Sequence, residues 1–181
     1  MFRYLAILIY KIIGWKCKNE NYPYHIKKKI LIAAPHTSNW DFPIGVMARS
    51  ILNDKIKYIG KESLFKPPLG WIMYPLGGIP VKRSKATSFV RAIVNEYLER
   101  EELAIVIAPE GQRKKVDHFK TGFYYIAKAA NIPIIPTVFD WEKKEVRFLD
   151  PIYTTEDSKA DIKKIEDMFR GIKGKVPKDS F

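Results

Sequence analysis

Residues 85–108 read KATSFVRAIVNEYLEREELAIVIA and predict a helix followed directly by a strand. In residues 85–102 the apolar side chains recur at the spacing of one helix face, with charged side chains elsewhere. Residues 103–108 form a continuous apolar run, which is typical of a strand buried on both faces. A helix that leads into a fully buried strand is the repeating unit of an α/β protein with a parallel sheet.

The same alternation continues on both sides of this unit. Short apolar runs bounded by Gly, Pro and polar residues predict strands, and amphipathic runs predict helices. We expect strands at 30–34, 56–59, 79–81, 132–138 and 146–149, and helices at 41–52 and 121–130. Because 181 residues is the length of one domain, we expect a single α/β domain whose mostly parallel central sheet is flanked by helices.

The two ends of the chain depart from this pattern. We expect residues 1–28 to form a membrane-associating helix and a polar linker that begins at residue 17. Residues 29–155 would form the α/β domain, and 156–181 a charged tail that ends in a helix and then frays. Residues 1–16 combine apolar side chains at helical spacing with basic and aromatic residues, which suits an interfacial helix. Periodicity alone allows a terminal helix packed on the core equally well, and no run is long enough to span a bilayer.

The composition narrows the classes of partner. Lys and Arg outnumber Asp and Glu by 32 to 20, for a net charge of +12. A basic surface favours nucleic acid, an anionic membrane, or a phosphorylated or thioester-carrying substrate. The single cysteine, Cys17, rules out an internal disulfide framework and a zinc site built from several cysteines. The 46% hydrophobic content is enough for a core and excludes a wholly disordered chain.

The first candidate site is the stretch PHTSNWD at residues 35–41, between an expected strand and an expected helix. Ligands and catalytic groups of open α/β sheets gather at the carboxyl ends of strands. Across a tight turn, the Asp41 carboxylate can hold one nitrogen of the His36 ring and leave the other to take a proton. The alternative is that Asp41 caps the following helix and His36 is structural.

A second candidate follows the strand at 103–108, where residues 109–115 read PEGQRKK. Gly111 allows a tight turn, Arg113 offers a planar fork for a phosphate or carboxylate, and Glu110 can position that fork. A third, Arg83, follows the expected strand 79–81 and could converge with Arg113 on one anion. Each of these stretches is also compatible with a solvated charged loop.

Residues 67–81, PPLGWIMYPLGGIPV, carry no formal charge. Their prolines and glycines exclude a regular spanning helix. Such a loop lines an acyl pocket, dips into a membrane, or is simply a buried connection.

Taken together, four blocks resemble a known family. They are HTSNWD at 36–41, GIPVKR at 78–83, PEGQR at 109–113 and IPIIP at 132–136, with FKTG at 119–122 between the last two. Their order and separation resemble the signature of the glycerolipid acyltransferases of the lysophosphatidic acid type (1-acylglycerol-3-phosphate, PlsC-like), over roughly residues 30–140. The HTSNWD form of the first block looks like a bacterial branch. Gln112, Lys114 and Pro35 depart from the usual family pattern.

The resemblance implies a mechanism and a set of site residues. His36 would be the general base that takes the proton of an acceptor hydroxyl, and Asp41 would orient it. The hydroxyl oxygen would attack an acyl thioester. Arg83, Glu110, Gly111 and Arg113 would bind the polar head of the acceptor, with Lys120 assisting by its charge.

The resemblance also implies partners and a location. The acceptor would be a lyso-lipid, and the co-substrate an acyl carrier protein or coenzyme A thioester, with no bound cofactor and no metal. The enzyme would serve phospholipid biosynthesis on an anionic membrane, as a peripheral protein on the cytoplasmic face of the inner membrane. We expect no nucleic-acid partner because the chain shows no recognition helix or zinc knuckle. Two alternatives stay open: an acyl-thioesterase that uses the same pair on water, and a basic protein that binds anions or nucleic acid.

Overall fold

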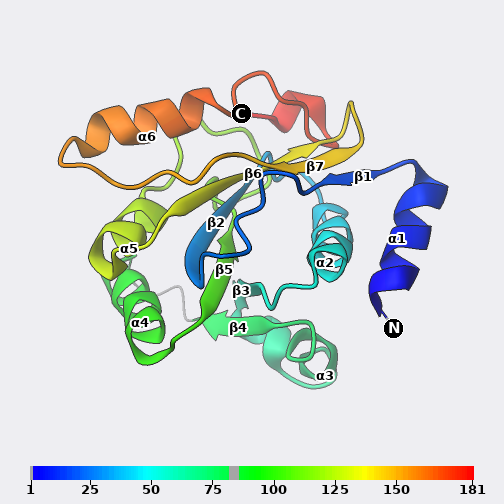
Figure 1. Ribbon diagram of the computed structural model, residues 1–181, viewed down its shortest axis with the longest axis horizontal. Coiled ribbons are helices and arrows are strands. Elements are labelled where there is room, and N and C mark those ends of the chain that lie inside the picture. The colour runs from blue at the N-terminus through cyan, green and yellow to red at the C-terminus, as the bar shows by residue number, and fades with distance from the viewer. Residues whose placement is uncertain (1, 82–85) are drawn as a thin grey trace.

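The computed structural model describes residues 2–81 and 86–181 and contains one sheet with helices on both faces (Figure 1). Arg83 lies outside the described residues. The strands are β1 (Lys16–Lys18), β2 (Lys28–Ala34), β3 (Lys57–Lys61), β4 (Gly78–Val81), β5 (Leu103–Ile107), β6 (Ile134–Asp140) and β7 (Glu145–Phe148). The helices are α1 (Phe2–Ile13), α2 (Asp41–Leu52), α3 (Gly70–Met73), α4 (Ala86–Glu99), α5 (Gly122–Ala130) and α6 (Ser158–Asp167), with 3-10 turns η1 (Glu62–Phe65) and η2 (Pro177–Asp179).

The seven strands lie in the order β1-β7-β6-β2-β5-β3-β4. Neighbouring strands pair in parallel, except that β6 and β7 are antiparallel. The expected α/β fold with a mostly parallel sheet is therefore confirmed. Because β5, β2 and β6 are parallel neighbours, the residues that follow their carboxyl ends meet at one edge of the sheet.

Alternate residues of the central strands face opposite helical layers. Ile30, Ile32 and Ile105 pack in the cluster formed with α4, α5 and α6. Leu31 and Ala104 pack in the cluster formed with α1 and α2 on the other face. The sheet is thus covered on both sides, which explains why its central strands are apolar without alternation.

Helix α1 packs on α2 by one face and leaves another face uncovered. Ala6 and Tyr10 are buried, and the Tyr10 hydroxyl donates to the Ile44 carbonyl over 2.8 Å. Exposed apolar side chains fill the outer face of α1: Phe2, Tyr4, Leu5, Leu8 and Ile12. One face of α1 is packed on the core, as expected for a terminal helix, and the other face exposes apolar side chains, as expected for an interfacial helix. Over the described ranges, no helix has the length and apolar content to cross a membrane.

Two stretches differ from expectation. Residues 17–28, expected as a linker, begin inside β1, which pairs with β7; its sequence, KCK, contains no apolar run that would predict a strand. The tail does form α6, but the expectation that it then frays is wrong. Phe169 is fully buried, and the centroid of the Phe181 ring lies 4.2 Å from that of the Phe119 ring. These partners are distant in sequence, so local patterns do not reveal them.

Candidate active site

The turn between β2 and α2 brings His36 and Asp41 together. β2 ends at Ala34 and α2 begins at Asp41, so the six intervening residues form a turn instead of continuing a helix. The Nδ1 atom of His36 lies 3.0 Å from Oδ2 of Asp41. The Asp41 side chain is 5% exposed and the His36 side chain 26%. Since the pair uses Nδ1, Nε2 is the nitrogen that can accept a proton from a substrate.

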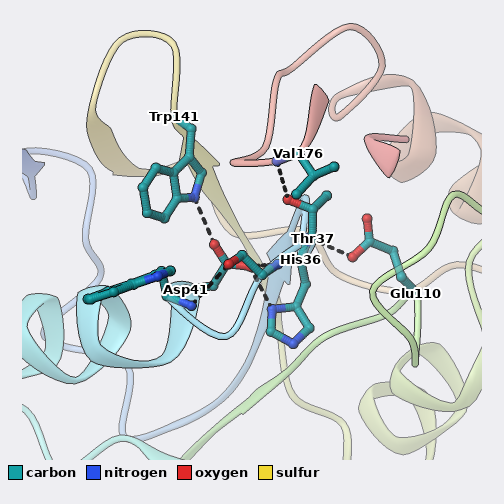
Figure 2. A network of polar contacts seen from close by, with 8 residues as sticks. His36, Thr37, Asp41, Glu110, Trp141 and Val176 are labelled. Carbon is teal, nitrogen blue, oxygen red and sulfur yellow. Dashed lines mark hydrogen bonds and ion pairs between the residues drawn. The ribbon is translucent and has the colours of Figure 1, made fainter. Parts of the chain in front are cut away.

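Further donors hold the Asp41 carboxylate, as Figure 2 shows. The backbone N–H of Ser38 donates to Oδ2 over 2.9 Å, and the indole Nε1 of Trp141 donates to Oδ1 over 2.7 Å. The N-cap position of α2 is Trp40, so the alternative in which Asp41 caps the helix is wrong. A buried carboxylate needs such partners because burial removes its hydrogen bonds to water, and leaving them unreplaced is costly.

Sequence reasoning did not identify Trp141 as a site residue. It directly follows β6, whose carboxyl end shares an edge of the sheet with that of β2. An aromatic residue with a hydrogen-bond donor at the end of a parallel strand is the signal that could have found it.

Glu110 lies two residues beyond the apolar run that contains β5, and it faces the backbone of the first site. Its Oε2 accepts a hydrogen bond from the His36 backbone N–H over 2.7 Å, and the residue is 2% exposed. Burial raises the pKa of the Glu110 carboxyl to about 7, although the hydrogen bond from His36 acts in the opposite direction. In this position Glu110 holds the turn that carries His36 (Figure 2).

The remaining predicted residues lie on the loop after β5. Gly111 has a φ of +68°, and a Cβ there would lie 2.7 Å from the Lys120 Nζ. The Lys120 side chain therefore crosses directly over Gly111. The backbone N–H of Lys120 donates to the Pro109 carbonyl over 2.9 Å. The Arg113 side chain is exposed on the same loop. The loop thus brings Gly111 and Lys120 together, with Arg113 nearby in the chain.

An apolar cavity of about 190 Å³ lies between α2 and the sheet and reaches His36 and Asp41. Residues of five strands and of α2 line it, among them Leu31, Val106, Phe139 and Val46. At the β4 side of its wall, the Arg49 guanidinium donates to the Leu76 carbonyl. In the described part of the chain, no group of three or more His, Cys, Asp or Glu side chains is placed to hold a metal ion.

Comparisons with known proteins place the chain among related sequences. A family model described as Acyltransferase matches residues 15–140. Human 1-acyl-sn-glycerol-3-phosphate acyltransferase beta is 34% identical over 147 residues, which are 71% of this chain and 51% of the human protein. The 1-acyl-sn-glycerol-3-phosphate acyltransferase of Escherichia coli strain K12 is 33% identical over 110 residues, 57% of this chain and 43% of that protein. The chain therefore spans about half the length of the curated relatives that it matches.

A solved structure has the same fold. The crystal structure of the 1-acyl-sn-glycerophosphate (LPA) acyltransferase PlsC from Thermotoga maritima matches with a TM-score of 0.66. The match covers 92% of this chain and 74% of that chain at 18% sequence identity. At this identity the likeness concerns the fold alone.

We expect Glu110→Gln to change how stability depends on pH. The pKa of Glu110 rises from 4.5 to about 7 on folding, so between these values the unfolded chain releases a proton that the folded protein keeps. The free energy of unfolding of the wild type should therefore fall as pH rises through this window, by up to about 3 kcal/mol. Gln can still accept from the His36 N–H and cannot ionise, so the variant should lack this component.

Urea unfolding of both proteins from pH 4.5 to 7.5 measures the difference. Stability curves that run parallel across the window would show that Glu110 does not titrate in this way.

Proposed function

The chain belongs to the Acyltransferase family, and from this premise we propose that it is an O-acyltransferase acting on a lyso-lipid. Family membership confirms the resemblance drawn from the four sequence blocks. In the proposed reaction, a fatty acyl group moves from a thioester donor to a hydroxyl of an acceptor such as 1-acylglycerol-3-phosphate. The observation that carries the proposal is the His36–Asp41 pair, 3.0 Å apart, at an apolar cavity.

In this reaction His36 acts as general base. Nε2 takes the proton of the acceptor hydroxyl while its oxygen attacks the thioester carbonyl carbon. The carbon–sulfur bond then breaks, and the departing thiolate receives the proton back from His36. Asp41 keeps the other ring nitrogen protonated and stabilises the imidazolium by its opposite charge, which is why its burial beside Nδ1 supports the assignment.

The apolar cavity supports a place for an acyl chain. Burying an alkyl chain is favourable by about 0.8 kcal/mol per CH₂, so an apolar cavity beside a reactive pair favours a lipid-like substrate. The cavity begins at His36 and continues between α2 and the sheet. A chain lying there would present its carboxyl end to Nε2.

The polar head of the acceptor would bind the basic loop after β5. Arg113 and Lys120 supply the positive charge, and Gly111 leaves the space that the Lys120 side chain crosses. Arg83 is assigned to the same anion by the second sequence block. Glu110 was expected to bind the polar head of the acceptor. In this proposal it instead holds the turn that carries His36, because its carboxylate contacts the His36 backbone.

The donor in this proposal is an acyl carrier protein or coenzyme A thioester, and the reaction uses no bound cofactor. Both donors carry negative charge, which suits a chain with a net charge of +12. The product is a two-chain lipid that must enter a bilayer.

We further propose a peripheral location on an anionic membrane, at the cytoplasmic face of the inner membrane. Helix α1 exposes seven large apolar side chains, Ile7 and Ile13 in addition to the five named above. A second exposed group lies on and around α3: Leu69, Trp71, Ile72 and Tyr74. Large apolar side chains exposed beside basic residues suit an interfacial contact that buries the former and attracts lipid phosphates with the latter.

Acyl transfer can be tested directly. Purified protein, with acyl-carrier-protein or coenzyme A thioesters of medium to long chain and a panel of lyso-lipids in vesicles, should yield a new two-chain lipid in mass spectrometry. His36→Ala should lower the rate by at least about a hundredfold, because general base catalysis contributes about 10²–10⁴-fold. Free fatty acid without acylated lipid would favour the thioesterase. No product with either donor from a folded protein would reject the proposal.

Arg113→Ala tests the head-group assignment. Losing a charge-assisted contact to the phosphate should raise the KM for a phosphorylated acceptor about tenfold or more, and leave the KM for the donor nearly unchanged. Steady-state kinetics with each substrate varied in turn measure both constants. Equal changes in the two constants would remove Arg113 from the acceptor site.

The membrane proposal predicts that the outer face of α1 controls vesicle binding. The triple variant Leu5→Gln, Leu8→Gln and Ile12→Gln should lower the partition onto anionic vesicles at least about tenfold, because three apolar side chains no longer enter the interface. A matched control is Leu98→Gln, Tyr125→Gln and Tyr153→Gln, which changes three exposed apolar side chains outside α1 and α3. Sedimentation with vesicles measures both, and equal losses in the two variants would contradict the proposal.

A further inference from the structure

Trp141 lies outside the four sequence blocks and touches the proposed catalytic pair. It follows β6, and its indole N–H donates to Oδ1 of Asp41 over 2.7 Å. The other oxygen of the same carboxylate accepts from His36 Nδ1. The Ser38 backbone N–H also donates to that second oxygen, so Trp141 is the partner of Oδ1 while His36 and Ser38 share Oδ2, and contacts at both oxygens define the rotation of the carboxylate about the side-chain bond (Figure 2).

The C-terminal segment holds Trp141 in place; we call residues 173–176 the C-terminal strap. The backbone N–H of Trp141 donates to the Lys173 carbonyl over 2.9 Å. The Lys175 Nζ lies 4.9 Å from the centroid of the Trp141 ring and 4.6 Å from that of Trp40. An ammonium at this distance is attracted by both rings. The strap therefore contacts Trp141, which donates to Asp41, and Trp40, which precedes Asp41 in the chain.

The strap also reaches the residue next to His36. The Val176 backbone N–H donates to the Thr37 hydroxyl oxygen over 3.1 Å (Figure 2). Gly174 comes so close that a Cβ would lie 2.5 Å from the same oxygen. Only glycine permits this approach without a shift of the backbone or of Thr37.

We propose that Trp141, held by the C-terminal strap, is a positioning residue that fixes the Asp41 carboxylate and thereby the Nδ1–H tautomer of His36. Its kinetic consequence rests on the proposed acyl transfer. Asp41 is 5% exposed, so loss of the indole N–H leaves Oδ1 without a donor in a dry environment. The carboxylate then lowers its free energy by rotating towards another donor, and this rotation weakens its hydrogen bond with His36.

The substitution Trp141→Phe keeps an aromatic ring and removes the N–H. We expect kcat for acyl transfer to fall about tenfold to a hundredfold, the range for a lost hydrogen bond to a charged group, with the KM of both substrates nearly unchanged. The ¹⁵N NMR shifts of the His36 ring should show mainly the Nδ1–H tautomer in the wild type and a mixture in the variant.

Trp15→Phe is the matched control. The Trp15 ring packs edge-on against Trp141 with the centroids 4.8 Å apart, and it is buried. This variant removes an indole from the same aromatic cluster without removing the donor to Asp41. The ring shifts of His36 should stay as in the wild type, even where the melting temperature falls.

A pair of glycine variants tests the strap separately. Gly174→Ala places a methyl group against Thr37 and should disturb the His36 ring shifts in the same sense as Trp141→Phe. Gly171→Ala, in the same segment, has open space around its Cβ and strains the backbone at a φ of +79°. It should lower stability and leave the ring shifts unchanged.

The proposal is overturned if the His36 tautomer in Trp141→Phe equals that of the wild type. It is also overturned if Trp15→Phe and Gly171→Ala change the tautomer as much as their partners do. The NMR measurement does not use the acyl substrates. If the wild type transfers no acyl group, the proposed function fails while the tautomer still decides the role of Trp141.

Discussion

The Asp41 carboxylate, buried and held by N–H groups of His36, Ser38 and Trp141, is the interaction on which the site depends. Two of these donors lie in the turn between β2 and α2, and the third follows the end of β6. A buried carboxylate without donors is costly, so the two segments are required to meet. The parallel pairing of β2 with β6 makes this possible, because it places both carboxyl ends at one edge.

A second buried carboxylate reinforces the same turn from the other side. Glu110 follows β5, the other parallel neighbour of β2, and accepts from the His36 backbone N–H. The turn is therefore held from both neighbouring strands, while the His36 ring stays partly open to the apolar cavity beneath α2. Rigid support beside an open cavity is the arrangement that positions a base against a bound chain.

The local sequence patterns located much of the site. The five-residue separation of His36 and Asp41, between a buried strand and a helix start, allowed the two side chains to meet across a tight turn, and the family resemblance favoured that hypothesis over a helix cap and a structural histidine. The role of Glu110 was not predictable in the same way, since a carboxylate after Pro109 gives no sign of which donor it will face. Trp141 was missed because its partner is 100 residues away in sequence. The strand β1 and the ordered tail were missed for the same reason: their contacts are long-range.

Periodicity and apolar runs by themselves determined the α/β class, the parallel sheet and the main helices, because these follow from burial repeated every two or about 3.6 residues. The sequence blocks likewise determined the family. Only the tertiary structure decided which groups share the sheet edge with His36. It directs Glu110 to a backbone N–H, brings Trp141 to Asp41 and folds the tail over Thr37. These contacts depend on strand order and chain reversal, which fix distances between residues that no local pattern relates.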